Sequence, residues 1–350
     1  MGERRAVPLS VLDIVPIFDG MTPSQAVRNS IELARRAEQL GYRRHWFAEH
    51  HNIPGVGVST PAVMAAHVAA ITTTLRVGAG GVMLPNHPPL VAAEQFTTLA
   101  VLYPDRVDLG LGRAPGTDPM TAQALRRVAT SQSGEGFETQ IRETLSYLGD
   151  GPVGGPRIVA MPVAETPPTV WLLGSSMASA RLAGSLGLPF AFAHHLGADT
   201  TVPALAAYRE TFTPSGALER PYTMVAAFVV VADTDERADW LAGPAKMSIV
   251  HVLGGRPGLH TTEEQAAAYR FSEFEAEVVD QRIGTQIVGG PDTARRRVTD
   301  LLDRTGADEL MALTTVRGLD DRVHSYQLLA DIMHGQPSAD LGPVAVNSQE

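Results

Sequence analysis

The sequence contains no cysteine, and this absence removes several kinds of chemistry from consideration. Without thiols the chain can form no disulfide, no thiolate nucleophile, no cysteine-ligated zinc site and no iron–sulfur cluster. Lysine is almost as scarce, because Lys246 is the single lysine among 28 basic residues. We attribute the excess of arginine to the codon bias of a GC-rich organism rather than to a mechanism.

The sequence also has no excess of basic over acidic residues and no long apolar run. The formal net charge is −10 at pH 7, so the chain lacks the basic face that a general nucleic-acid-binding protein uses to displace counterions. No run of ~18 apolar residues is free of charges or helix breakers, so no membrane span is predicted. The charged first five residues do not resemble a signal peptide, and we therefore expect a soluble cytoplasmic protein.

Several well-known catalytic patterns do not occur. The chain has no G-x-S-x-G, P-loop, H-E-x-x-H or EF-hand sequence, which argues against a Ser-His-Asp hydrolase and against those nucleotide and metal sites. Residues 110–116 superficially resemble a dinucleotide fingerprint, but their spacing is G-x-G-x-x-x-G and Pro115 disturbs the helix start that a pyrophosphate needs. We therefore reject a Rossmann site, and no metal site is predicted.

The residues that are present indicate a globular α/β protein. Hydrophobic residues make up 44% and charged residues 19% of 350 residues, which excludes a disordered chain and leaves ample length for a core. Short apolar segments alternate with helical periods. The predicted strands are 9–15, 45–48, 75–83, 107–111, 169–173, 189–193, 222–232 and 307–315. The predicted helices are 23–40, 61–73, 88–103, 135–148, 177–186, 203–211 and 320–333.

This alternation favours a single (β/α)₈ TIM barrel over residues 1–335, rather than an open doubly wound sheet with a second domain. Residues 149–168 are rich in glycine and proline and predict an inserted loop or hairpin. Residues 246–284 break the alternation, so insertions are expected after strands four and seven. Residues 336–350 predict a flexible C-terminal tail.

A closed barrel places its site at the C-terminal ends of the strands, which directs attention to Glu49, His50 and His51 after the second strand. A neutral imidazole can accept or donate a proton near pH 7 because its reference pKa is ~6.5. The alternative is a network at the rim in which Glu49 only orients a histidine. A metal site is disfavoured because adjacent residues of an extended segment point in opposite directions.

Three glycines interrupt the third strand, in the order Gly78, Ala79, Gly80 and Gly81. Such a cluster weakens a strand, and it permits a bulge, an unusual peptide geometry or the close approach of a flat ligand to bare backbone. A tight corner of the barrel would explain the glycines equally well.

Two further strand ends carry residues that suit a phosphate. Arg113 follows the fourth strand, where its guanidinium can clamp an anion, although a salt bridge to Asp105 or Asp118 is the plainer reading. Ser175 and Ser176 follow the fifth strand at the start of a helix, whose N–H groups and dipole attract anions.

Simple capping of that helix by either serine is the alternative to a phosphate site. Residues 190–195 end the sixth strand with the paired histidines His194 and His195. These histidines could line a substrate pocket, or they could be loop residues that follow two core phenylalanines.

Taken together, these segments resemble the bacterial-luciferase-like family of flavin-dependent monooxygenases, and in particular its single-chain oxidoreductases. The resemblance runs from about residue 9 to residue 333. The motifs that carry it are FAEHHN (47–52), RVGAGGVMLPNHPP (76–89), DRVDLGLGRAPGTD (105–118), WLLGSSMASA (171–180) and GADELMALT (306–314). Each motif is weak by itself, but their order and their positions after strands make the set specific.

The resemblance implies a barrel that binds reduced FMN. His50 matches the family's active-site histidine, and Arg113 matches a phosphate-contacting arginine. Two backbone segments complete the implied site, namely the bulge against the isoalloxazine ring, often with a cis peptide (Ala79, Gly80, Gly81), and the phosphate cradle (Gly174, Ser175, Ser176). The reactive cysteine of some luciferases is absent, so we do not infer light emission.

The resemblance also implies the reaction. Reduced FMN and dioxygen, through a C4a-hydroperoxyflavin, would oxygenate an organic substrate such as a polyketide or another secondary metabolite. A separate NAD(P)H-flavin reductase is expected to supply the reduced flavin, and a homodimer is expected, with residues 61–73 as one candidate interface. Residues 120–134 and 246–284 match no member closely enough to name a substrate.

Four alternatives remain open at this point: an F420-dependent oxidoreductase, a non-catalytic flavin-binding paralogue, a subunit of a heterodimer and a sugar-phosphate barrel enzyme.

Overall fold

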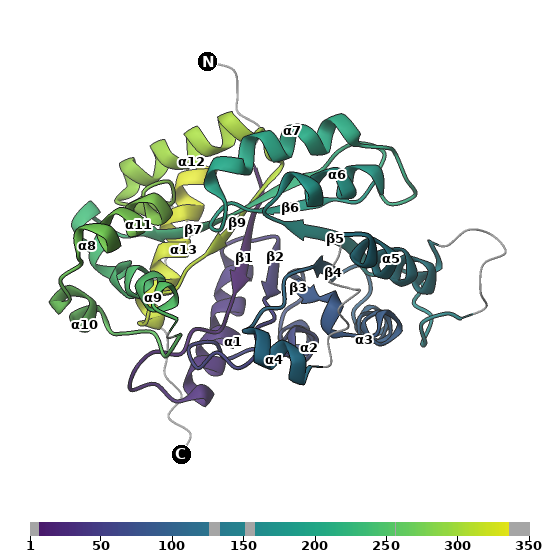
Figure 1. Cartoon of the computed structure of the whole chain (residues 1–350), viewed down its shortest axis with the longest axis horizontal. Coiled ribbons are helices and arrows are strands. Elements are labelled where there is room, and N and C mark those ends of the chain that lie inside the picture. The colour runs from purple at the N-terminus through teal and green to yellow at the C-terminus, as the bar shows by residue number, and fades with distance from the viewer. Residues whose placement is uncertain (1–6, 126–133, 151–157, 256, 336–350) are drawn as a thin grey trace.

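The computed structural model describes residues 7–125, 134–150, 158–255 and 257–335. Its parallel strands, except β8, close into a barrel in the order β1, β2, β3, β4, β5, β6, β7, β9 and back to β1 (Figure 1). The predicted (β/α)₈ fold is confirmed. The strands are β1 (Leu9–Asp13), β2 (Arg44–Phe47), β3 (Arg76–Met83), β4 (Val107–Gly112), β5 (Thr169–Gly174), β6 (Phe190–Ala193), β7 (Thr223–Val231), β8 (Ile287–Gly289) and β9 (Glu309–Leu313).

Helices surround the barrel, as Figure 1 shows. Local sequence explains their ends; for example, Thr22 and Gln25 form a capping box at the first turn of α1, and Leu33 and Ala37 belong to its buried face. None of the described helices is both long and apolar enough to span a membrane. The helices of the ring are α1 (Pro23–Gln39), α2 (Pro61–Ile71), α3 (Pro89–Leu102), α5 (Gly134–Leu145), α6 (Met177–Ser185), α7 (Thr201–Thr211), α12 (Pro291–Thr305) and α13 (Leu319–His334).

The insertion after β7 is more regular than the sequence suggests. It contains the helices α8 (Asp235–Leu241), α9 (Gly243–Leu253), α10 (Glu263–Ala268) and α11 (Glu273–Ile283), and it ends in the short strand β8. Strand β8 pairs with the C-terminal end of β7, where Val229–Val231 lie opposite Ile287–Gly289. The sequence prediction missed α4 (Pro119–Ala124), α8, α9, α10, α11, α12 and β8. The helices after β7 lie in or beside the segment where the alternation breaks, and the three residues of β8 are too few to show alternation.

The insertion after β4 contains α4 (Pro119–Ala124). Two parts of the predicted 149–168 loop are described: residues 149–150 end a π-helical turn (Ser146–Asp150), and residues 158–168 form no helix or strand. The predicted tail, 336–350, lies outside the described residues, as does most of the segment 120–134 beyond α4.

The barrel interior is filled by inward-facing side chains that alternate along each strand. Trp46 and Trp171 meet edge to face, with ring centroids 5.2 Å apart, in the part of this interior nearer the N-terminal ends of the strands. Above them the inward positions become small, with Ala48, Ala191 and Ala226 in the same buried cluster. The interior is therefore filled by large side chains toward the N-terminal ends of the strands, and the smaller side chains leave space toward their C-terminal ends.

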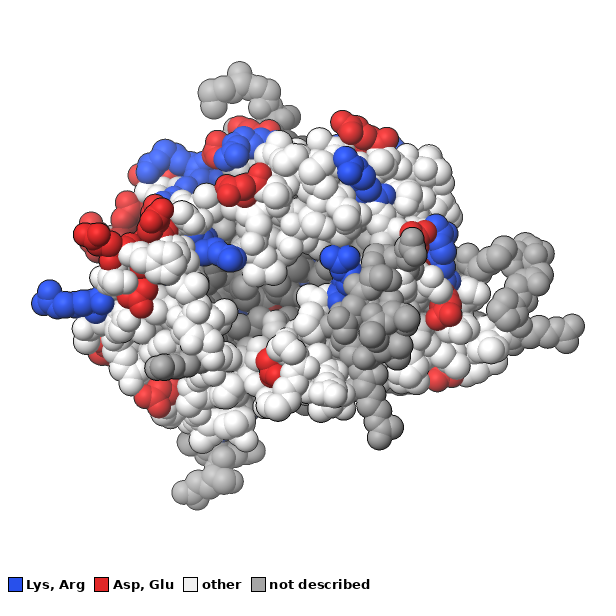
Figure 2. Space-filling model, viewed as in Figure 1, with Lys and Arg blue, Asp and Glu red and all other residues white. Residues whose placement is uncertain are grey.

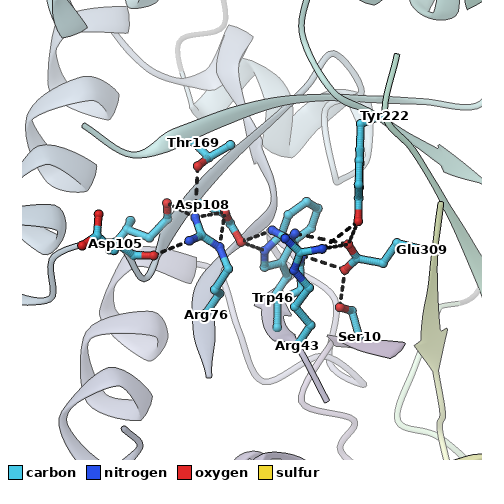
Figure 3. A network of polar contacts seen from close by, with 11 residues as sticks. Ser10, Arg43, Trp46, Arg76, Asp105, Asp108, Thr169, Tyr222 and Glu309 are labelled. Atoms are coloured by element: carbon cyan, nitrogen blue, oxygen red, sulfur yellow. Dashed lines mark hydrogen bonds and ion pairs between the residues drawn. The ribbon is translucent and has the colours of Figure 1, made fainter. Parts of the chain in front are cut away.

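Charged side chains close the opposite, N-terminal end of the barrel (Figure 3). Arg44, at the start of β2, donates to Glu309 Oε1 at 2.7 Å and to Asp108 Oδ2 at 2.7 Å. Arg76 donates to Asp108 Oδ1 at 2.6 Å, and the Tyr222 hydroxyl donates to Glu309 Oε2 at 2.8 Å. These groups satisfy one another, so this end of the barrel is a structural plug and the C-terminal end is the place for a site.

Candidate active site

The C-terminal mouth of the barrel is open and mostly uncharged. Ile14, Leu173 and Leu313 are partly buried side chains that pack on the interior cluster that contains the buried alanines. Figures 1 and 2 share one view, and a hollow lined mainly by uncharged surface opens in the region where β1 and β2 end. Small residues below and apolar residues around it create a concave, dry space of the kind that binds small molecules.

Glu49 organises the rim of this mouth. Its buried carboxylate accepts hydrogen bonds from His51 Nε2 at 2.8 Å, His87 Nε2 at 2.9 Å and the Met83 backbone N–H at 3.1 Å. Burial by itself raises the pKa of Glu49, but these hydrogen bonds and the nearby His87 hold that pKa below its usual value. The rim network left open from the sequence therefore exists, and it orients His51 and His87 rather than His50.

His50 differs from its neighbours because its ring is not held by this network. Two-residue steps from Trp46 and Ala48 place it on the inward side of the segment that follows β2. Its Nδ1 atom is buried and has no hydrogen-bond partner among the described residues. Burial lowers the pKa of His50, and the neighbouring His51 lowers it further against the opposing effect of Glu49. The imidazole is consequently neutral at pH 7 and can accept or donate a proton.

The glycines of β3 form the bulge that the sequence suggested. The register with β4 shifts between Gly80 and Val82, and the Gly80–Gly81 peptide bond is cis. A Cβ atom on Gly80 would lie 2.8 Å from Leu12 Cδ1, and one on Gly81 would lie 2.6 Å from the Gly110 carbonyl oxygen. Glycine is therefore required for packing, and bare backbone faces the interior beside β4 and β5.

Gly81→Ala is expected to lower the free energy of unfolding by about 1–3 kcal/mol, because the methyl group overlaps backbone that cannot move away easily. Urea unfolding followed by circular dichroism measures the change. The matched control is Gly216→Ala, since a Cβ atom there meets nothing within 4 Å. Equal unfolding midpoints for the two variants would show that Gly81 is not sterically required.

Arg113 and the start of α6 lie on one rim of the mouth. Strands β4 and β5 are neighbours in register Leu111↔Leu172, so Arg113 lies level with Gly174, which is followed by the two serines. The Ser176 hydroxyl caps α6 by accepting from Ser179 N–H at 3.3 Å, so the predicted capping role is present at Ser176.

Glycine at position 174 has a packing reason, since a Cβ atom there would lie 2.0 Å from Ser179 Oγ. Ser175 is exposed, and the first turn of α6 presents N–H groups without intrahelical partners. Asp105 precedes β4 and lies at the opposite end of the barrel, so it is no partner for Arg113. Asp118 is the N-cap of α4, where its Oδ1 accepts from Met120 N–H at 2.9 Å.

A separate cavity of ≈ 460 Å³ lies outside the mouth, among α8, α9, α11 and α12. Most of its polar side chains already have partners: Lys246 pairs with Asp239, Asp235 accepts from Gly290 N–H and the Thr293 hydroxyl, and Arg297 donates to the Gln286 carbonyl oxygen. We therefore place the candidate site at the barrel mouth rather than here. Within the described residues, no three histidine or carboxylate side chains are arranged to hold a metal ion.

Comparisons with known proteins agree with this geometry. The family model for luciferase-like monooxygenases matches residues 9–309. The chain is 46% identical over 332 residues to an uncharacterized protein, YvbT, of Bacillus subtilis (strain 168), covering 94% of this chain and 98% of that one. It is 40% identical to a luciferase-like monooxygenase of Escherichia coli (strain K12), covering 94% and 97% of the two chains.

Solved structures give the same fold. The crystal structure of apo-MsnO8 superposes with a TM-score of 0.87 at 34% identity, covering 95% of this chain and 99% of that one. At 17% identity, the oxygenating constituent of 3,6-diketocamphane monooxygenase of Pseudomonas putida, solved in complex with FMN, gives 0.68 with coverages of 97% and 100%. An F420-dependent secondary alcohol dehydrogenase gives 0.61 at 13% identity, covering 92% and 97%.

Proposed function

The chain belongs to the luciferase-like monooxygenase family, and from this premise we propose that it uses reduced FMN and dioxygen to oxygenate an organic substrate. The observation that supports this most is that four consecutive strands, β2 to β5, end at one rim. His50, whose Nδ1 has no partner among the described residues, the partly exposed Gly80, Arg113 and Ser176 lie in or just after these strands, and we take them as the lining of the cofactor site. When bound, reduced flavin supplies the two electrons with which dioxygen gives one oxygen atom to the substrate and one to water.

The residues present fit this cofactor. A flat ring needs a wall without side chains. Gly80 and Gly81 carry none, and Gly80 is partly exposed while Gly81 beside it is buried. An anionic tail needs cationic and N–H donors, which Arg113 and the first turn of α6 provide on the adjoining rim. In this proposal Gly174, Ser175 and Ser176 hold the phosphate, together with Arg113.

The chain's own contribution to the reaction is to exclude water and to move a proton. Ile14, Leu173 and Leu313 line the mouth with apolar surface, which shields a reactive bound group from bulk water. The neutral imidazole of His50 holds or accepts a proton at a ring nitrogen during oxygen transfer, because its buried Nδ1 has no competing partner in the described chain.

Arg113→Met is expected to weaken FMN binding about 10- to 100-fold while leaving riboflavin binding within about threefold, because a charge-assisted hydrogen bond contributes ~1.5–3 kcal/mol and only FMN carries the phosphate. Fluorescence titration of the flavin measures both affinities. The matched control is Arg35→Met, which removes a half-exposed arginine from the outer helix α1. An equal loss of FMN and riboflavin affinity would contradict the phosphate role of Arg113.

The partners complete the proposal. We expect a separate NAD(P)H-dependent reductase to supply reduced flavin, and we place the substrate among organic molecules such as polyketides and other secondary metabolites. An F420-dependent reaction is the second candidate, because the fold is shared with an F420-dependent dehydrogenase. Hydride transfer with F420 in the absence of oxygen would favour that candidate, whereas a strict requirement for dioxygen would favour FMN.

The outer faces of α2 and α3 support a homodimer. Both helices are apolar on most sides, and they expose Val63, Val91, Val101 and Leu102, which is unusual for helices that face water. The double variant Val63→Glu/Leu102→Glu is expected to sediment as a monomer, while Val252→Glu, a charge placed on the exposed surface of α9, leaves the dimer intact. A monomeric wild-type chain in sedimentation velocity would contradict the proposal.

A further inference from the structure

The two histidines that follow β6 have different surroundings. His194 is buried, with Nδ1 at 2.7 Å from the Thr201 hydroxyl and Nε2 at 3.3 Å from the Thr285 carbonyl oxygen. Both ring nitrogens therefore connect β6 to α7 and to the segment before β8. His194 is part of the scaffold and has no nitrogen left for a ligand.

His195 keeps one ring nitrogen for a ligand. Its backbone N–H donates to the Ala226 carbonyl oxygen at 3.2 Å, which extends the ladder between β6 and β7 by one more residue pair. Residues 194–196 form a turn at the end of β6, and the His195 ring interacts electrostatically with the His50 imidazole, which places it toward the mouth. The ring Nδ1 lies 2.9 Å from the same Ala226 oxygen.

That contact fixes the tautomer of His195. A carbonyl oxygen can only accept, so Nδ1 carries the proton and Nε2 presents its lone pair. Burial lowers the pKa of His195 to about 4, and the nearby imidazoles of His194 and His50 lower it as well, against the hydrogen bond to Ala226. Within the described chain no group bonds to Nε2, so this atom is a neutral acceptor without a protein donor.

His50 and His195 approach the mouth from opposite walls. In the closed barrel β2 and β6 are separated by three strands in either direction, which is the greatest separation that eight strands allow. The two imidazoles interact electrostatically, and each is one member of a histidine pair whose other member bonds to the scaffold. A molecule in the mouth therefore lies between two neutral imidazoles.

We propose that His195 selects the substrate of this site, and that the substrate is an apolar molecule carrying a hydroxyl group, such as a phenol or an apolar alcohol. This inference rests on the proposed function, because it takes the mouth to be the substrate site. The apolar side chains of Ile14, Leu173 and Leu313 suit the body of such a molecule. A hydroxyl satisfies Nε2, whereas an ether or ketone offers only lone pairs and leaves the acceptor unpaired at a cost in affinity.

Thymol and its methyl ether provide a matched pair of probes, because they share an apolar body and differ in the donor. Calorimetric titration of the full chain, with and without FMN, is expected to show thymol binding about 10- to 100-fold more tightly than the ether. His195→Phe is expected to reduce this preference to within about threefold, while His195→Gln, which retains an acceptor oxygen, keeps part of it. His334→Phe, at the exposed C-terminal end of α13, is the control and keeps the full preference.

The donor that meets Nε2 has a second possible source, the N–H groups of a reduced flavin, and the same variants distinguish it. The assignment is overturned if the wild type does not prefer thymol to its methyl ether, or if His195→Phe keeps that preference. It is also overturned if neither probe binds. His195→Phe could instead lower the affinity for reduced FMN about tenfold and leave the thymol preference unchanged. That result would assign the Nε2 acceptor to the flavin and would also overturn the proposal.

Failure of FMN to bind, with a thymol preference that still depends on His195, would refute the proposed function and leave this inference standing. His195→Leu replaces His195→Phe if the latter does not fold.

Discussion

Replacing Arg44 with methionine is expected to lower the free energy of unfolding by about 3–5 kcal/mol, because it leaves buried carboxylates without their main counter-charge. The Arg44 guanidinium is almost fully buried at the closed end of the barrel and donates to Glu309 and to Asp108. It also lies over the Trp171 ring, 4.8 Å from the centroid. One side chain thus links three strands and caps the aromatic layer of the interior.

Removal of Arg44 does not affect the carboxylates of Asp108 and Glu309 equally, because they keep different hydrogen-bond partners. Asp108 keeps hydrogen bonds from Arg76 and from Trp46 Nε1, the latter at 2.9 Å. Among the described residues, Glu309 keeps Ser10, the Tyr222 hydroxyl and the half-exposed Arg43, whose Nη1 lies 3.8 Å away. The double variant Arg44→Met/Glu309→Gln is therefore expected to be more stable than the sum of the two single changes indicates.

The same change alters the response to acid. Burial raises the pKa of Asp108, but Arg44 and Arg76 outweigh burial and hold that pKa below its usual value of 3.8. Asp108 therefore contributes stability above pH 3.8, and this contribution disappears as the pH falls through the lower pKa of the folded state. Removing Arg44 raises the folded-state pKa, so acid unfolding is expected to begin at a higher pH.

Urea unfolding measures both effects, and Arg43→Met is the matched control. Arg43 is the adjacent arginine, but its side chain is 46% exposed, so its loss is expected to cost no more than ~1 kcal/mol. If Arg43→Met and Arg44→Met lower the free energy of unfolding by similar amounts, the buried ion pairs of Arg44 do not stabilise the fold more than the exposed contacts of Arg43.

His50→Ala is expected to reduce the yield of oxygenated product about 10²–10⁴-fold, because general acid–base catalysis by one positioned side chain contributes a factor of that size. The affinity for FMN is expected to change little, since the proposed phosphate and ring contacts lie on other strands. The measurement supplies reduced FMN and isotopically labelled dioxygen to a panel of phenols, ketones and aldehydes, and it detects the label in the product by mass spectrometry.

The pH dependence separates a proton-transfer role from a packing role. Burial lowers the pKa of His50 below its usual 6.5, so the neutral form persists above that pH and product yield is expected to be constant there. The yield falls only as the pH drops through the lowered pKa, and His50→Gln is expected to lose this fall together with most of the activity. Product yields in His50→Ala equal to those of the control His334→Ala would remove His50 from the mechanism.

The barrel was predictable because its signals are local. Pro23, Pro61 and Pro89 open their helices at the first position, and the nine residues of β7 are all buried, which gives a continuous apolar run. The insertion after β7 was recognised as a break in the pattern. Its helices were missed because they do not alternate with strands of the barrel, and β8 was missed because only its pairing with β7 makes it a strand.

The candidate site was predictable only where chemistry-bearing residues follow strands. That rule found His50, Arg113, Gly174, Ser175, Ser176 and the glycines of β3, and the structure brings the ends of their strands to one rim. It could not separate His194 from His195, because the difference depends on the contacts of each ring.

The plug at the opposite end was missed for a related reason. Arg44 and its partners Asp108 and Glu309 are 64 and 265 residues apart, and each stands at a strand start.

Anaerobic titration of the purified chain with reduced FMN, followed by admission of dioxygen, tests the proposed role of the mouth most directly. We predict saturable binding of reduced FMN that is weakened by Arg113→Met, no comparable binding of reduced F420, and consumption of dioxygen by the complex. Failure of reduced FMN to bind, or a clear preference for reduced F420 with no reaction toward dioxygen, would contradict it.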